Sequence, residues 1–172
     1  MGACLTMAMQ VGHSQTLPQL SKDPIEKIVA AMTAEEKVSL LVGTGMPGFG
    51  GQSAVVGSTQ NIVPGAAGTT FPIERLGIPA IVVADGPAGL RISPTREGNK
   101  ATYYCTAFPV ATLLASTWNT ALVKNVGNAM GDEVKEYGCD VLLAPALNIH
   151  RSPLCGRNFE YYSEDPYLTG RI

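Results

Sequence analysis

Polar and charged side chains crowd the stretch between Pro145 and Pro166, directly after an apolar run. The residues concerned are Asn148, His150, Arg151, Arg157, Asn158, Glu160, Glu164 and Asp165. Their amide, imidazole, guanidinium and carboxylate groups can donate and accept hydrogen bonds to a polar ligand. This set is too dense to serve only as a connector between two packed elements. We therefore place a candidate binding site in this stretch.

A second group of candidates follows another apolar run, which extends from Pro79 to Ala84. Asp85 stands at its carboxyl end, the next four residues must turn sharply, and Arg91 then falls on the same loop. A carboxylate and a guanidinium at one strand end can hydrogen-bond the hydroxyl groups of a ligand. They can equally form a salt bridge that pins the loop. The residue types alone leave both interpretations open.

A strand and the helix before it must position the first group. Residues 139–144 contain the continuous apolar run VLL, which predicts a parallel strand covered on both faces. Apolar residues recur at helical spacing from Asn119 to Tyr137, and Gly138 ends that helix. Together with the strand at 79–84, this order implies a right-handed parallel unit. Ligands bind at the carboxyl ends of such strands.

Two shorter helices are expected nearer the amino end, where they serve as scaffold. Asp23 caps the first and Pro24 occupies its first position. Thr33 and Glu36 have the spacing of a capping box for the second helix, which ends at Gly43.

The remaining segments are expected to be loops with short helical turns. The Gly- and Ser-rich stretch 43–70 is predicted to be a long loop over the mouth of a site. A helical turn is expected at 71–76, residues 110–115 are helical or extended, and Asp165 with Pro166 starts another helix.

Composition narrows the class of protein. The chain has 172 residues, of which 45% are hydrophobic and 15% charged, and its net charge is −2, which suits one modest globular core. The absence of a Lys/Arg cluster argues against nucleic acid or an anionic membrane surface as partner. No apolar stretch of about 18 residues occurs, so no membrane span is expected.

The four cysteines, Cys4, Cys105, Cys139 and Cys155, show no pair or histidine spacing of a zinc site, so no metal is expected. Cys139 opens a strand and is predicted to be buried. Cys105 and Cys155 lie in loops, either free or bridged.

Three segments resemble, in the same order, signature segments of family 3 glycoside hydrolases, the β-glucosidase family. They are VADGPAGLR at 83–91, TAFPVATLLASTWN at 106–119 and NIHRSPLCGRNFEYYSEDPYLTG at 148–170. The resemblance covers roughly residues 24–172. It implies an α/β fold, namely the first portion of a (β/α)8 TIM-like barrel that is incomplete at its C-terminus, because such a barrel needs about 250 residues. Residues 23–172 would form this partial N-terminal barrel domain.

The resemblance also implies roles for individual residues. Asp85 and Arg91 would contact the glycosyl unit in the −1 subsite, and Arg157 would be a third residue of that subsite. Glu160 is expected to orient an arginine, and Arg151 to brace its loop. These five residues constitute the predicted substrate-binding and supporting set.

The catalytic pair is expected beyond Ile172. Retaining glycosidases place a nucleophile and an acid/base carboxyl about 5–5.5 Å apart, and Asp85 with Glu160, Glu164 or Asp165 could be proposed from residue types. In the family, however, the nucleophile is an Asp in an S-D-W-like motif further along, followed by the acid/base Glu, and neither motif occurs here. The family's Lys-His pair is absent as well. This chain alone is therefore expected to be inactive.

Two further side-chain types have alternative roles. His150 is better explained as a hydrogen-bonded loop histidine than as a ligand contact, because no metal-ligating residue stands at a suitable spacing. Trp118, Tyr161 and Tyr162 could stack on a sugar, although buried packing is the commoner role of such residues.

By the resemblance, the parent enzyme hydrolyses terminal non-reducing β-D-glycosides with retention. Its substrate would be a β-glycoside or oligosaccharide, it would need no cofactor, and its other partner would be the C-terminal part of the same enzyme. Related activities, β-xylosidase or β-N-acetylglucosaminidase, remain alternatives, as does a non-catalytic carbohydrate-binding remnant. An oxidoreductase is disfavoured, because D-G-P-A-G is not the G-x-G-x-x-G fingerprint. Residues 1–22 form a tail with the short apolar run of a signal remnant but without its basic n-region. Because members of the resembled family are often secreted or periplasmic, the resemblance implies a periplasmic or secreted protein, with a cytoplasmic one as the alternative.

Overall fold

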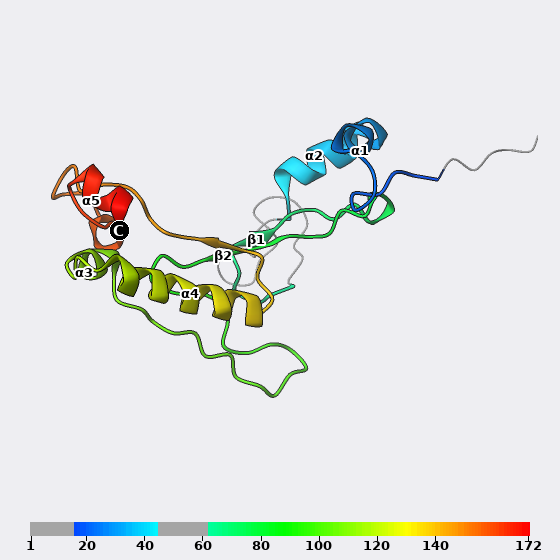
Figure 1. The fold of residues 1–172 in the computed structure, drawn as a ribbon. Helices are drawn as coiled ribbons and strands as arrows, with labels where there is room; N and C mark the ends of the chain where they lie inside the picture. Colours follow the sequence, from blue (N-terminus) through cyan, green and yellow to red (C-terminus); the bar gives the residue numbers. More distant parts are fainter. Residues whose placement is uncertain (1–15, 45–61) are drawn as a thin grey trace, which may run out of the picture.

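The computed structural model describes residues 16–44 and 62–172. The predicted tail therefore lies mostly outside the described residues, and so does most of the predicted loop at 43–70. Figure 1 shows α1 and α2 at one end of the molecule and α3 and α5 at the other. The small sheet and the long helix α4 lie between these two ends.

The sheet has three short strands in the order β1-β2-β3, formed by Gly68–Thr69, Val82–Asp85 and Val141–Leu143. Strands β2 and β3 are parallel, with Val83 opposite Val141 and Asp85 opposite Leu143. The predicted parallel pair is thereby confirmed, and α4 (Thr120–Glu136) connects its two strands. Strand β1 is antiparallel to β2 and was not predicted, since its two residues lie in a Gly-rich stretch without periodicity.

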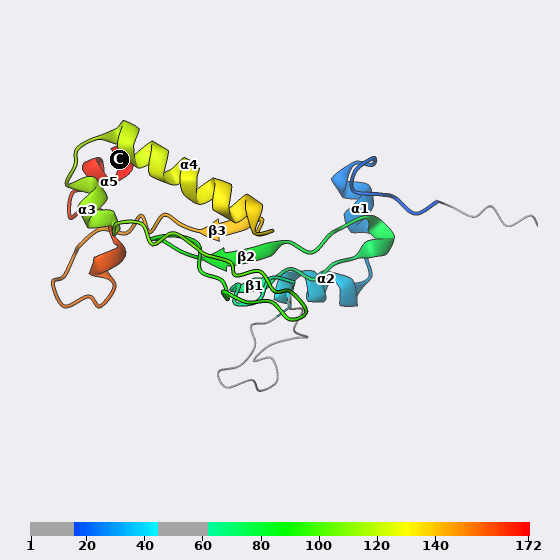
Figure 2. The same cartoon turned by 90° about the horizontal axis from the view of Figure 1, so that it is seen from below.

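The prediction that the strand at 139–144 is covered on both faces is wrong for this structure. Val141 is 42% exposed and Leu143 49% exposed. The reason is position, because β3 is the edge strand of the sheet and α4 lies on one side of it, as Figure 2 shows. Cys139, immediately before the strand, is 6% exposed, so its predicted burial is confirmed.

Helix α4 follows the predicted pattern closely. Asn119 is its N-cap, and the Asn119 side chain accepts a hydrogen bond from Leu122 N at 3.0 Å. Met130 and Val134 are the buried members of its apolar face, whereas Leu122 is 42% exposed. The segment at 110–115 is helical, as α3 (Ala111–Ala115).

The two amino-terminal helices are α1 (Ile25–Ala31) and α2 (Ala34–Val42). The capping box of α2 is confirmed, because Thr33 N donates to Glu36 and Glu36 N donates to the Thr33 hydroxyl. Asp23 does not cap α1. Its carboxylate instead accepts a hydrogen bond from Gln19 N at 3.0 Å, which tightens the turn before the helix.

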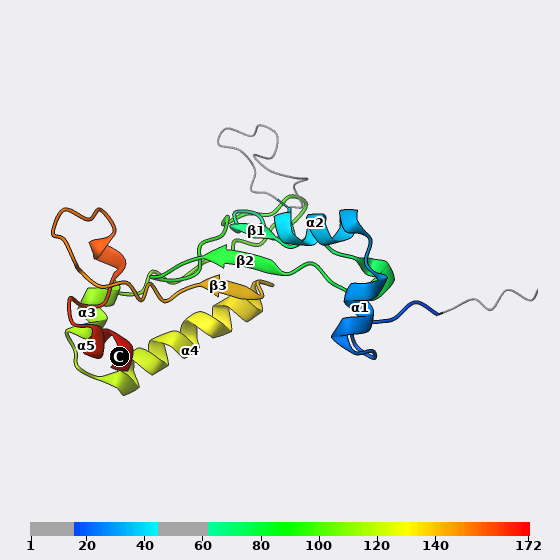
Figure 3. The same ribbon diagram turned by 90° about the horizontal axis from the view of Figure 1, so that it is seen from above.

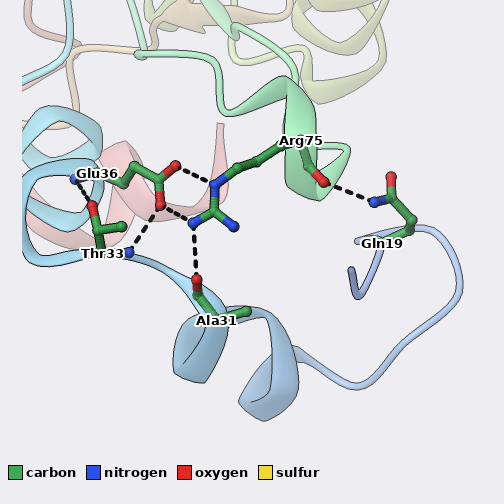
Figure 4. Close-up of polar contacts among 5 residues, drawn as sticks. All are labelled: Gln19, Ala31, Thr33, Glu36 and Arg75. Atoms are coloured by element: carbon green, nitrogen blue, oxygen red, sulfur yellow. Dashed lines mark hydrogen bonds and ion pairs between the residues drawn. The ribbon is translucent and has the colours of Figure 1, made fainter. Parts of the chain in front are cut away.

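Arg75 joins these helices to η1 (Glu74–Leu76), the helical turn expected at 71–76. Its guanidinium donates both Nε and Nη2 hydrogen bonds to the Glu36 carboxylate, and Nη2 also reaches Ala31 O at 2.9 Å. Gln19 Nε2 donates to the Arg75 carbonyl at 2.8 Å (Figure 4). A planar guanidinium suits this forked contact.

Buried apolar side chains form two clusters. The first packs α1 against η1 through Ile28, Met32, Ile73 and Leu76. The second, which we call the sheet cluster, consists of Val63, Val82, Ala84, Leu90, Val134 and Cys139. It joins the inner face of β2 to the last turn of α4. Within the described residues, no helix is long and apolar enough to cross a membrane.

Candidate functional site

Asp85 is the last residue of β2 and enters a turn that only glycine permits. Gly86 has φ +155°, and a Cβ atom added there would lie 1.9 Å from Gly89 O. Gly89 N donates to Gly86 O at 3.2 Å, and Arg91 N donates back to Asp85 O at 2.9 Å. The turn therefore brings Asp85 and Arg91 beside each other, as the sequence predicted.

The ion pair between these two residues is loose. Arg91 Nη1 lies 3.7 Å from Asp85 Oδ2, and the two side chains are 80% and 48% exposed. Exposed pairs of this kind contribute little to stability. The backbone hydrogen bonds hold the turn instead, together with Phe108 N, which donates to Ala88 O at 2.8 Å. The interpretation that a salt bridge between Asp85 and Arg91 holds the loop is therefore weak, and both side chains are available to a ligand.

Arg157 precedes η2 (Asn158–Glu160), and its guanidinium Nε donates to Glu160 Oε1. Glu160 raises the pKa of Arg157, first through this hydrogen bond and then through its charge, and the Asp85 carboxylate acts in the same direction. The Glu160 side chain is 10% exposed and that of Arg157 is 70% exposed. Glu160 thus holds one side of the guanidinium, whose free part is exposed to solvent, and its role of orienting the arginine for a ligand stays a prediction.

The two candidate segments meet around the start of α3. A hollow of about 70 Å³ is lined by Pro87 and Ala88 of the turn, by Val110 and Ala111 at the start of α3, and by Phe159 and Glu160 of η2. The Thr112 hydroxyl donates to Tyr161 O at 2.7 Å, which ties α3 to the residue after η2. Figures 2 and 3 show α3 at the end toward which the β2 arrowhead points. The Arg157–Glu160 pair therefore lies near the turn that carries Asp85 and Arg91, and the Asp85 charge acts on Arg157.

The contact between Thr112 and Tyr161 could not be predicted from the sequence. A threonine inside an apolar segment carries no signal of a tertiary partner, and η2 itself has no periodicity to mark it. The contact matters because it links α3 to the residue that follows η2.

His150 and Arg151 differ in their contacts. His150 Nε2 lies 2.8 Å from Asn158 O and 3.1 Å from Tyr161 O, so it is a hydrogen-bonded loop histidine, as predicted. Arg151 is exposed, and no hydrogen bond or ion pair of its side chain occurs in the part of the chain that the structure describes. Its bracing role stays a prediction. Asp165 caps α5 (Pro166–Arg171) by accepting from Tyr167 N at 2.8 Å, which confirms the expected helix start.

The three aromatic candidates have different environments. Tyr161 is buried and Tyr162 is half-buried. Trp118, for which burial was the expected role, is 75% exposed with φ +55°, so that expectation is wrong. Trp118 lies in the short connection between α3 and α4, where its side chain is exposed to solvent.

Neither a metal site nor a disulfide occurs among residues 16–44 and 62–172. No group of three potential metal ligands is present there. Within these ranges Cys105, Cys139 and Cys155 are free thiols, which favours the free alternative for Cys105 and Cys155.

Comparison with known proteins agrees with this geometry. Residues 28–172 match the family model described as the N-terminal domain of glycosyl hydrolase family 3. The chain is 43% identical over 150 residues to β-glucosidase A of Butyrivibrio fibrisolvens and 41% identical over 153 residues to thermostable β-glucosidase B of Acetivibrio thermocellus. These matches cover 87% and 86% of this chain but only 16% and 17% of the relatives.

A solved structure is similar as well. β-Glucosidase 3B of Thermotoga neapolitana, in complex with α-D-glucose, superimposes with a TM-score of 0.76 and is 61% identical. That match covers 86% of this chain and 20% of the Thermotoga chain. The chain thus spans a sixth to a fifth of the length of these proteins. It belongs to glycosyl hydrolase family 3, with residues 28–172 matching within that family's N-terminal domain.

Proposed function

We propose that this domain supplies part of the −1 glucosyl subsite of a retaining β-glucosidase, through Asp85, Arg91 and Arg157. The observation that carries the proposal is the meeting of the Asp85 turn with the Arg157–Glu160 pair at the carboxyl end of β2. In α/β barrels, residues at this end of the strands bind and transform the substrate. The proposal places β2 and β3 within such a (β/α)8 barrel.

The chemistry of the three side chains suits a sugar ring. The Asp85 carboxylate can accept hydrogen bonds from two neighbouring hydroxyl groups, and each guanidinium donates several hydrogen bonds in fixed directions. Arg157 is held by Glu160, so its remaining N–H groups are oriented before the ligand arrives. Such preorganisation lowers the entropic cost of binding and strengthens contacts that tighten in the transition state.

The proposal assigns the bond-breaking carboxyl groups to another part of the parent enzyme. A retaining glycosidase forms a glycosyl-enzyme intermediate on one carboxylate while a second carboxyl protonates the leaving oxygen. Asp85 lies in a loose pair with Arg91, which leaves its carboxylate free to bind hydroxyl groups, and the nearly buried Glu160 accepts the Nε hydrogen bond of Arg157. Neither is well placed as nucleophile or acid, so both serve in binding and orientation.

A chimera tests the proposal. Residues 28–172 replace the matching segment of the Thermotoga β-glucosidase, and the chimera and the 172-residue chain are assayed on nitrophenyl β-glucoside, β-xyloside and β-N-acetylglucosaminide. We expect the chimera to hydrolyse the glucoside best and to release β-glucose first, and we expect no turnover by the chain alone. Turnover by the chain alone would return the search for catalytic carboxyls to Asp85, Glu160, Glu164 and Asp165.

A further inference from the structure

The segment between Ser93 and Thr106 is fastened along the last turns of α4. Thr106 N donates to both carboxylate oxygens of Glu133, at 3.0 and 3.2 Å. The Tyr137 hydroxyl donates to Tyr104 O at 2.7 Å. Arg96 Nη2 donates to Tyr137 O at 2.7 Å. Residues 104 and 106 are therefore both tied to the end of α4.

Cys105, between these two residues, turns inward. Tyr104 and Thr106 are exposed, whereas Cys105 is half-buried, which is the alternation of an extended chain. Its side chain packs against the sheet cluster, which includes Cys139. Cys139 follows Tyr137 by two residues, and its N–H donates to Val134 O at 2.9 Å. Two thiols from distant parts of the chain thus share one apolar cluster.

Burial keeps both sulfurs protonated. Burial is the main factor that raises the pKa of the Cys105 thiol, and the charge of Glu133 adds to it. Burial also raises the pKa of Cys139, and Cys105 acts in the same direction. Raised pKa values slow the reaction of each thiol with oxidants. Cys105, the more accessible of the two, is the one that an external reagent reaches first.

We propose that Cys105 and Cys139 form an intramolecular disulfide when the folded protein meets a low-molecular-weight disulfide. The Cys105 thiolate attacks one sulfur of the reagent, forms a mixed disulfide and releases one thiolate. The Cys139 thiolate then attacks the Cys105 sulfur, breaks the mixed bond and releases the second thiolate. The protein loses two electrons and two protons, and the reagent is reduced to two thiols.

The bond would fasten the segment that supports the Asp85 turn. A Cβ atom added to Gly89 would lie 2.2 Å from Thr106 O, and Phe108 N donates to Ala88 O. Residues 106–108 therefore pack directly on the turn. A cross-link at Cys105 would restrain these residues against the sheet, and it would close a loop that contains α3 and α4. Closure of a long loop stabilises the folded state by restricting the unfolded chain.

The test uses the full chain with Cys4→Ser and Cys155→Ser, which leaves only the two cysteines of interest. The protein is treated with glutathione disulfide in mildly alkaline buffer, and intact mass and peptide mapping follow without reduction. We expect the mass to fall by two hydrogen atoms, a cross-linked peptide that contains both cysteines, and a higher Tm than that of the reduced protein. Far-UV circular dichroism before treatment establishes that the variant is folded.

Two further variants separate the steps. Cys139→Ser in the same background should stop at a glutathione adduct on Cys105, and Cys105→Ser should remain largely unmodified because Cys139 is buried. The same cysteine sets are tested in the chimera, where activity reports the fold independently. A stable glutathione adduct on Cys105 while Cys139 remains a thiol would overturn the proposal, and so would a cross-link that appears only in urea.

Discussion

The Arg157 guanidinium donates its Nε hydrogen bond to the carboxylate of Glu160, three residues later. The carboxylate is nearly buried, whereas most of the guanidinium is exposed. The buried member therefore determines the direction of the exposed one. A substrate would meet Arg157 already oriented, and Glu160 would act on it only through Arg157.

This relationship predicts the behaviour of Glu160→Gln in the chimera. The variant keeps the shape of the side chain but loses its charge, so we expect kcat/KM to fall about tenfold, the equivalent of one charge-assisted hydrogen bond. Steady-state kinetics of Glu160→Gln, Arg157→Lys and the double variant provide the measurement.

The double variant distinguishes positioning from an independent role. Because Glu160 acts through Arg157, Glu160→Gln should cost much less in the Arg157→Lys background than in the parent. Equal losses of kcat/KM in both backgrounds would show that Glu160 contacts the substrate itself.

Gly86→Ala should destabilise the protein because the turn after Asp85 requires φ +155° and has no space for a Cβ atom. Strain of this kind costs about 1–3 kcal/mol, to which the clash with Gly89 O adds. Gly127→Ala is the matched control, because Gly127 lies inside α4 with no atom within 4 Å of the added Cβ. In urea unfolding, Gly127→Ala should be more stable than the parent protein by about 0.5–1 kcal/mol, whereas Gly86→Ala should be less stable than the parent. Equal stability of the two variants would mean that the turn is not as described.

Leu76→Ala tests the cluster that joins η1 to α1. Leu76 is fully buried, so the substitution should lower the free energy of unfolding by about 2–5 kcal/mol. Leu41 is 87% exposed on α2, and Leu41→Ala should change stability by no more than about 0.5 kcal/mol. Urea denaturation of both variants gives the comparison, and a small effect at Leu76 would contradict the packing.

The contacts of Glu36 predict how the stability of the protein depends on pH in the acid range. Its hydrogen bonds from Arg75, and secondarily from Thr33 N, lower the pKa of the Glu36 carboxyl. A lowered folded-state pKa contributes stability that is complete above the unfolded value of about 4.3 and is lost as the pH falls through the folded-state value. The stability difference between the parent and Glu36→Gln should therefore be constant near neutral pH and shrink in acid. Arg75→Met should remove the same pH dependence, and retention of that dependence would refute the assignment.

Local signals in the sequence predicted the helices well because caps and periodicity act over a few residues. The capping box at Thr33, the Asn119 cap and the Asp165 start all appear in the structure. Strand β1, in which Gly68 and Thr69 pair antiparallel with Val83 and Val82 of β2, left no such pattern, because two residues cannot show a period.

The local contacts of the candidate site could be predicted from the sequence, but not how its two segments come together. The Asp85–Arg91 turn is local and follows from its glycines, and so does the Arg157–Glu160 pair. The contact between them depends on Thr112 and the position of α3, which are tertiary features. Burial was the least predictable property, as the exposed Trp118 and Leu143 show.

The most direct measurement is kcat/KM of the chimera on nitrophenyl β-glucoside with Asp85→Asn, and Asp132→Asn is its matched control on the exposed face of α4. If Asp85 binds the sugar, its substitution should lower kcat/KM about 10- to 150-fold, since it loses charged hydrogen bonds that strengthen in the transition state. The control should retain full activity. An Asp85→Asn chimera that folds and works as well as the control would contradict the assignment of the −1 subsite to this domain.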